Sequence, residues 1–104
     1  MTNVSSLEVR IEKKKLERAA YVLKCVAHPV RISIIDLLEQ RTRLTVSELQ
    51  EVLKIEQSLL SHHLTNMRDK GVVNTQREGK NVYYFLTDVS ITNIIDCING
   101  CKVF

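Results

Sequence analysis

Residues 57–86 change their hydrophobic spacing once, and this change limits the folds open to the chain more than any other feature. In the first half, Leu60, Leu64 and Met67 recur at the three- and four-residue spacing that aligns side chains on one face of a helix. Gly71 follows, and glycine readily adopts the left-handed conformation in which many helices end. The segment therefore begins with an amphipathic helix that stops before Gly71.

The second half of the segment alternates apolar and polar residues over Val72–Leu86, which predicts a β-hairpin. Gly79-Lys80 lies near the middle of the run, where a short turn would reverse the chain. Arg77 and Lys80 then lie at the tip of the hairpin. We therefore expect the helix to be followed by a two-stranded wing whose cations contact phosphates.

The polar side of the predicted helix carries groups suited to contacting DNA bases. Small hydroxyl and amide side chains near a helix N-terminus can reach base edges in the major groove without holding the backbone away. These groups, together with one imidazole, are Gln57, Ser58, Ser61 and His62. Gln57 is expected to bond adenine, whereas Arg68 contacts either the DNA backbone or an acid inside the domain. A helix face that is merely solvated is the competing interpretation.

A second helix is expected just upstream of the first. Thr45-Val-Ser-Glu48 has the form of a capping box, and a short amphipathic helix would run from it to about Lys54. A tight turn at Ile55-Glu56 then leads into the polar-faced helix. Helix, turn, helix and hairpin make a winged helix-turn-helix. We therefore predict one domain over residues 1–104, α+β and mainly α, with about five helices and a two-stranded β-hairpin wing.

The chain has one proline and three glycines, and these residues help to mark the boundaries of the remaining helices. The first helix should cover about residues 6–26. Pro29 suits the first turn of a helix over Val30–Glu39. Leu44 is expected to form a one-residue strand beside the wing, and a last helix should cover about residues 88–99.

Four segments share a more specific pattern than the helix spacing alone. They are AHPVRISIIDLL (27–38), LTVSEL (44–49), QSLLSHHLTNMRDKGVV (57–73) and REGKNVYYFL (77–86). Together they resemble the ArsR/SmtB family of bacterial transcriptional repressors, over roughly residues 20–101. The resemblance implies a homodimeric repressor that sits on an inverted repeat, often leaves it when an inducer binds, and dimerises through its two terminal helices. The inducer is unknown.

The last helix is more apolar than the surface of so small a domain should be. Its apolar residues are Val89, Ile91, Ile94, Ile95, Cys97 and Ile98. We expect it to pack on a second subunit, with the first helix offering a matching stripe. A twofold dimer sets two recognition helices about 34–36 Å apart and predicts a near-palindromic operator in double-stranded DNA. The alternatives are a monomeric core and a winged-helix module that binds a protein without binding DNA.

Length and composition agree with this class and weigh against others. A chain of 104 residues is one domain, and its net charge of +3 permits binding to a polyanion without proving it. An 18-residue apolar run is missing, and Met1–Ser6 lacks the apolar core of a signal peptide, so a cytoplasmic protein without a membrane partner is expected. No oxyanion signature or pocket-forming glycine loop accompanies the Cys and His residues. We therefore predict no enzyme and no cofactor.

Three thiols are the candidates for sensing: Cys25, Cys97 and Cys101. In a cytoplasmic chain they are expected to be reduced. Thiolates bind zinc, cadmium or arsenite, and a dithiol can act as a redox switch. A metal-responsive or thiol-responsive repressor that uses these cysteines therefore remains an alternative, beside buried cysteines that act only as small hydrophobic residues.

The family pattern weighs against a metal site. Many members carry paired cysteines where this chain has Thr45-Val46-Ser47. Others place four ligands along the last helix, at positions that are here Asp88, Ser90, Cys101 and Phe104. Only two of those four residues are metal donors, and a closed zinc site needs four. We therefore expect no resident metal.

Overall fold

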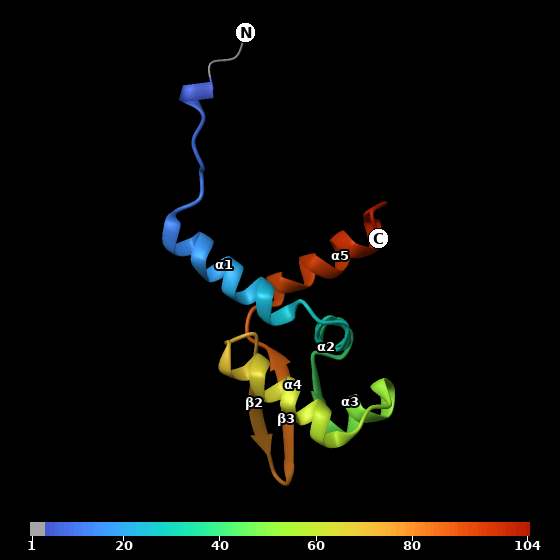
Figure 1. The fold of residues 1–104 in the computed structure, drawn as a ribbon. Helices are drawn as coiled ribbons and strands as arrows, with labels where there is room; N and C mark the ends of the chain where they lie inside the picture. The colour runs from blue at the N-terminus through green and yellow to red at the C-terminus, as the bar shows by residue number, and fades with distance from the viewer. Residues whose placement is uncertain (1–3) are drawn as a thin grey trace.

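The computed structural model describes residues 4–104, and within this range it contains five α-helices and a three-stranded sheet, with α1 and α5 above the sheet in the view of Figure 1. The elements are α1 (Lys13–Val26), α2 (Pro29–Arg41), β1 (Arg43–Thr45), α3 (Val46–Leu53), α4 (Gln57–Asp69), β2 (Val73–Glu78), β3 (Asn81–Leu86) and α5 (Asn93–Gly100), with short 3-10 helices η1 (Val4–Ser6) and η2 (Val89–Thr92). The predicted fold class, a mainly α winged helix-turn-helix, is confirmed. The predicted domain start at residue 1 lies outside the described residues. None of the described helices is long and apolar enough to cross a membrane.

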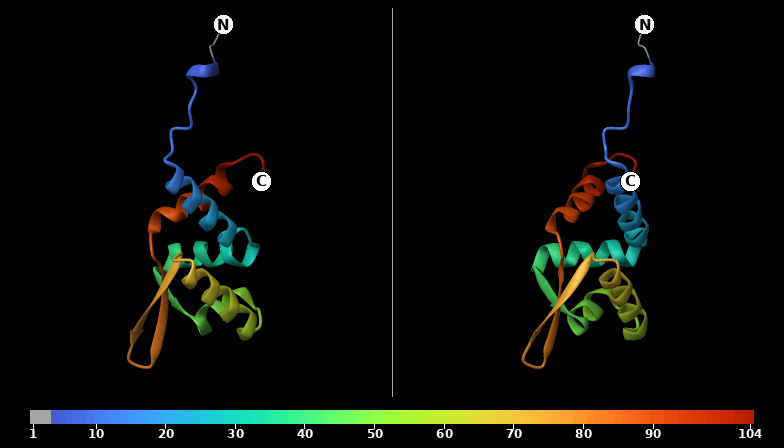
Figure 2. Two further views of the ribbon diagram at one scale, coloured as in Figure 1. Left: turned by 60° about the vertical axis from the view of Figure 1, so that its left-hand side comes forward. Right: turned by 90° about the vertical axis from the view of Figure 1, so that its left-hand side faces the viewer.

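The hairpin forms as predicted and gains a third strand. β3 lies between β1 and β2, and both neighbours are antiparallel to it. Leu44 lies opposite Tyr84, so the strand expected at Leu44 exists but extends over three residues. The turn at Gly79-Lys80 places Gly79 at φ 64°, a conformation that glycine adopts without steric cost. The far half of the hairpin projects from the helices as a wing (Figure 2).

The core lies where α2, α3 and α4 pack together against the base of the sheet. Its most deeply buried side chains are Ile34, Ile35, Leu38, Leu49, Leu60, Leu64, Met67 and Val73. Each side chain of this size stabilises the fold by about 1.5–3 kcal/mol when it leaves water. Three of the eight belong to α4, so the core holds that helix in a single rotational setting.

The capping box of α3 is confirmed. The Thr45 hydroxyl accepts a hydrogen bond from the Glu48 backbone N–H at 3.2 Å, and the Glu48 carboxylate accepts one from the Thr45 backbone N–H at 3.0 Å. These bonds lower the pKa of Glu48. At the other end, Lys54 takes a left-handed conformation with φ 54° and stops the helix. The short turn that follows delivers the chain to the start of α4.

The predicted start of the first helix is wrong. α1 begins at Lys13 and not near residue 6, and residues 7–12 belong to no helix or strand and are exposed. A protein helix owes most of its stability to an apolar face packed on other elements. No other element of the described chain covers residues 7–11, so an extension of α1 would gain nothing from packing.

The predicted last helix is divided in two. Asp88 caps η2, its carboxylate accepting a hydrogen bond from the Ser90 backbone N–H at 2.9 Å, and this bond lowers the pKa of Asp88. A 3-10 turn follows, and α5 begins only at Asn93. α5 ends at Gly100, close to the predicted end near residue 99.

Arg31 on α2 ties the end of α1 to α4. Its Nη1 atom donates to the Cys25 carbonyl oxygen at 2.9 Å and to Asn66 Oδ1 at 2.8 Å, and its Nε atom donates to His63 Nδ1 at 3.0 Å. Hydrogen bonds with a charged donor are stronger than neutral ones. One side chain therefore holds three segments at fixed distances.

His63 accepts the Arg31 hydrogen bond as a neutral imidazole. The side chain is buried, and its ring centroid lies 4.5 Å from that of His28. Burial, followed by the neighbouring His28, Arg31 and His62, lowers the pKa of His63. A proton on Nδ1 would remove the acceptor and place a second cation beside the guanidinium, so the junction requires the neutral form.

Replacing Arg31 with methionine should destabilise the fold. Arg31→Met leaves the Cys25 carbonyl, Asn66 and His63 without their donor, which costs about 1–3 kcal/mol in the free energy of unfolding. Arg41→Met, at the exposed end of the same helix, should change it by less than about 0.5 kcal/mol. Urea unfolding of both variants at one protein concentration makes the comparison, and equal losses would contradict the role given to Arg31.

The free energy of unfolding should fall as pH drops below about 6.5, the ordinary pKa of an unfolded histidine. Below that pH the unfolded chain takes up a proton that native His63 resists, so protonation favours unfolding. His63→Asn keeps an acceptor for Arg31 without titrating, and it should flatten this slope, whereas His62→Asn at the exposed neighbouring position should not. Denaturant titrations at several pH values test this, and equal slopes for the two variants would exclude His63 as the source.

Candidate nucleic-acid interface

α4 divides cleanly into a buried side and an exposed side. The buried residues are Leu60, His63, Leu64 and Met67, whose spacing keeps them on one side of the helix. Residues on the opposite side project away from the core. α3 and α2 both contact α4, and the residues on the other side of the helix are exposed.

The predicted base-contacting residues lie at the N-terminal half of this exposed side. Gln57, Ser58 and His62 are exposed, and Ser61 is half-buried on the flank. Gln57 is the first residue of the helix, and no side chain caps the helix N-terminus. The backbone N–H groups of the first turn are therefore free to bond an anionic oxygen.

Thr65 belongs to the same surface and was not predicted. It is exposed and lies four positions after Ser61 and three after His62, one turn farther along the helix. Spacing from Ser58 alone would have placed it on this side. The next residue, Asn66, is held by Arg31, so its Oδ1 atom belongs to the interior junction rather than to the surface.

Arg68 is exposed in the last turn of α4. Two alternatives were open for it, a contact with the DNA backbone and an ion pair with an acid of the domain. Across residues 4–104 the ion pair found is that of Arg43, and Arg68 takes no part in it. Its guanidinium is therefore available to an external anion.

The tip of the wing has a net positive charge because Arg77 and Lys80 outnumber its one acid, Glu78. Glu78 forms an ion pair with Arg43 of β1, and this hydrogen bond raises the pKa of Arg43. The Arg43 guanidinium also lies over the Tyr83 ring, 4.1 Å from its centroid. Arg77 and Lys80 are exposed beside the turn, as predicted, with Arg77 donating to the Gly79 carbonyl at 3.4 Å.

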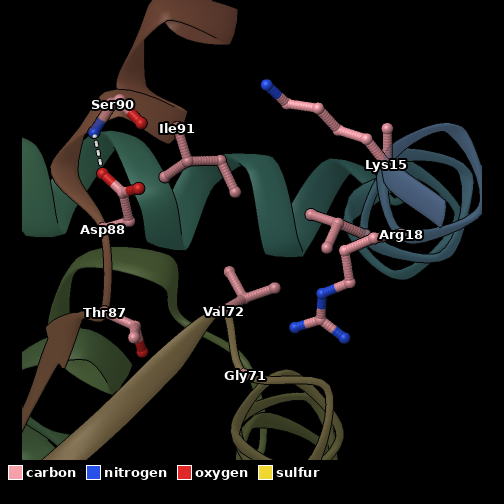
Figure 3. A pocket seen from close by; sticks show the side chains of 10 residues that line it. Lys15, Arg18, Gly71, Val72, Thr87, Asp88, Ser90 and Ile91 are labelled. Carbon is pink, nitrogen blue, oxygen red and sulfur yellow. Dashed lines mark hydrogen bonds between the residues drawn. The ribbon is translucent and has the colours of Figure 1, made fainter. Parts of the chain in front are cut away.

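A hollow of about 560 Å³ lies on another side of the molecule, between α1, the turn after α4 and the start of η2 (Figure 3). On the side formed by α1 and Gly71, the Arg18 guanidinium donates to the Lys70 carbonyl at 3.0 Å. A Cβ atom at Gly71, whose φ is 80°, would lie 3.0 Å from the same guanidinium. On the far wall, the Asp88 carboxylate is engaged with Ser90. These polar groups already serve the fold, so the hollow is a junction between α1 and the end of α4.

The three cysteines do not share one environment. Cys25 is buried, and its thiol lies 3.6 Å from Asn66 Oδ1, toward α4. Cys97 is exposed and lines an apolar groove between α1 and α5, and Cys101 is half-buried. Within residues 4–104 no three His, Cys, Asp or Glu side chains are arranged to hold a metal ion. Cys25 and Cys97 therefore face different sides of α1.

Comparison with known proteins shows which family the chain belongs to. The family described as "Bacterial regulatory protein, arsR family" matches residues 28–75, which contain α2, α3 and α4. The transcriptional repressor PagR of Bacillus anthracis is 37% identical over 90 residues, which are 86% of this chain and 90% of PagR. The crystal structure of PagR matches with a TM-score of 0.78 at 36% identity and covers 85% of this chain and 100% of that one.

A second relative is described as an activator. The transcriptional activator HlyU of Vibrio cholerae is 33% identical over 87 residues, 84% of this chain and 80% of HlyU. A solved structure of HlyU has a TM-score of 0.77 at 31% identity and covers 89% of this chain and 100% of that one. The resemblance seen in the sequence is confirmed at the level of the family. The protein belongs to the ArsR family of bacterial DNA-binding transcriptional regulators.

Proposed function

We propose that the protein binds a near-palindromic operator in double-stranded DNA as a homodimer, with the exposed side of α4 in the major groove. The observation that carries this proposal is the division of α4, in which Leu60, Leu64 and Met67 are fully buried while Ser58, His62 and Thr65 are exposed. A helix of this kind fits the width of the major groove. A mobility shift on DNA sites selected from a random-sequence pool tests it directly.

Each predicted contact has a distinct role in this proposal. Gln57 forms a bidentate bond with adenine, and the hydroxyl and imidazole groups after it contact base edges or nearby phosphates. Arg68, Arg77 and Lys80 contact phosphates, which adds affinity without choosing a sequence. The uncapped N-terminus of α4 supports a further phosphate contact.

The dimer forms through the terminal helices on this proposal. An apolar groove of about 490 Å³ lies between them, and its lining carries no charged side chain. We call the residues that line it the groove residues: Leu23, Val26, Ala27, Ile32, Asn93, Ile94, Cys97, Ile98 and Phe104. Apolar patches of this kind mark protein interfaces. A second copy covers them and sets two α4 helices on successive major grooves of one duplex.

Repression requires only that the bound dimer occlude a promoter, so we propose repression as the outcome of binding. Regulation by metal along α5 is not part of the proposal. Ser90 and Phe104 carry no metal donor at two of the four positions that the family uses, and the Asp88 carboxylate is occupied as a helix cap. The alternative, a winged-helix module that binds a protein without binding DNA, predicts no complex with operator DNA even at low salt.

Gln57→Ala should reduce the preference for the operator over random DNA. Loss of one bidentate base contact costs about 1–3 kcal/mol of discrimination, or roughly 5- to 150-fold in the ratio of dissociation constants. The control is Gln40→Ala, an exposed glutamine at the end of α2, which should leave the ratio unchanged. Fluorescence anisotropy at one salt concentration measures both, and an unchanged ratio for Gln57→Ala would remove its role in specificity.

Removing the two wing cations should weaken binding to every sequence alike. Arg77→Ala/Lys80→Ala removes two phosphate contacts, so the slope of log K against log salt should become less steep by about 2. Lys24→Ala, an exposed cation near the end of α1, should leave the slope unchanged. Titrations from low to moderate salt on operator and random DNA test this. A loss confined to the operator would show that the wing contacts bases instead.

A further inference from the structure

Residues 7–12, which we call the arm, alternate in character along the sequence. Leu7, Val9 and Ile11 are apolar, and the positions between them are charged. Successive side chains of an extended chain point to opposite sides. As a strand, the arm would therefore have one apolar side and one charged side, the pattern of a segment that is covered on one side only.

The apolar side of the arm is open to solvent within one protomer. Leu7 is 70% exposed, Val9 is 74% exposed and Ile11 is 51% exposed. Scattered exposed apolar residues are ordinary, but a contiguous group at regular spacing marks an interface. The apolar side of the arm is therefore a candidate surface for contact with a second chain.

The exposed apolar surface continues from the arm along α1. Leu16 is 39% exposed and Leu23 is 54% exposed, and Leu23 is itself one of the groove residues. The arm, the outer side of α1 and the groove thus form one strip. This strip is continuous with the surface through which, on the function proposed above, two copies of the chain meet.

The arm does not cover the groove of its own protomer. α1 is 14 residues long, about 21 Å at the rise of an α-helix, and the groove lies at its C-terminal end. The arm leaves the N-terminal end of α1 and runs away from the rest of the fold, and all three views agree on this direction (Figures 1 and 2). A second copy across the dimer interface is the occupant that its position favours.

We propose that the two protomers exchange arms, so that the apolar side of each arm lies in the groove of the other protomer. Glu8 and Arg10 then remain in water on the opposite side, and no charge enters the groove, whose lining is uncharged. Arm exchange rests on the proposed dimer of terminal helices. It adds to that dimer a second contact, formed by arm residues that lie outside α1 and α5.

A disulfide between the arm and the groove tests the exchange. Cys97 is an exposed groove residue, so Val9→Cys in a Cys101→Ser background should form a disulfide to Cys97 of the other protomer when the full chain is treated with diamide. Glu8→Cys, on the charged side, should react at least tenfold more slowly. Nonreducing electrophoresis then shows a covalent dimer, which Cys97→Ser abolishes.

Two results of this experiment would overturn arm exchange. A disulfide within one chain would show that the arm folds back onto its own groove. Equal cross-linking from Glu8→Cys and Val9→Cys, or a covalent dimer that survives Cys97→Ser, would show that the apolar side has no fixed partner.

The energetic contribution of the arm is measured separately in the full chain. Leu7→Ser/Val9→Ser/Ile11→Ser should raise the dimer dissociation constant at least tenfold in sedimentation experiments, whereas Glu8→Gln/Arg10→Gln should change it less than twofold. An unchanged constant for the serine variant, with operator binding intact, would overturn arm exchange alone. A parent protein that stays monomeric or fails to bind DNA would overturn the proposed function, and arm exchange with it.

Discussion

Burial of one side of α4 is the constraint on which the rest of the structure depends. Leu60, Leu64 and Met67 are 0% exposed, and each stabilises the fold by about 1.5–3 kcal/mol through that burial. Rotation of the helix about its axis would bring them into water. Because residues turn by about 100° each along a helix, fixing the buried side also fixes which side chains face outward. The chemistry of the outer surface is therefore set from the core, and Arg31 fastens the same helix to α1 and α2.

The terminal segments are stabilised differently. α2, α3, α4 and the sheet enclose a core of their own, whereas α1 contributes buried side chains only at its last two residues, Cys25 and Val26. On the proposals above, the remaining apolar surface of α1, α5 and the arm is buried by a second copy. In the proposed dimer, a change at the surface between the protomers would alter the spacing of the two α4 helices. The core of each protomer would stay folded, because it does not depend on that surface.

The parts of the fold that the sequence predicted are those with local determinants. The capping box of Thr45 and Glu48 and the turn at Gly79 each depend on residues within four positions. The junction at Arg31 was not predicted, because its partners His63 and Asn66 lie 32 and 35 positions away. The early start expected for α1 failed for a related reason. Helix formation at residues 7–12 depends on packing partners, and one protomer supplies none among its described residues.

The exposed residues of α4 were also predictable from local sequence, namely from helical spacing, and Thr65 is the one that was missed. Exposure of Gln57, Ser58 and His62 was expected from helical spacing and is observed. Thr65 was overlooked although the same spacing includes it. The central claim, that the outward side of α4 enters the DNA, is tested most directly by NMR shift mapping on a selected operator. We predict that the largest backbone amide shifts occur over residues 57–65 and at the wing tip. Shifts confined to α1 and α5, with α4 unaffected, would contradict the account.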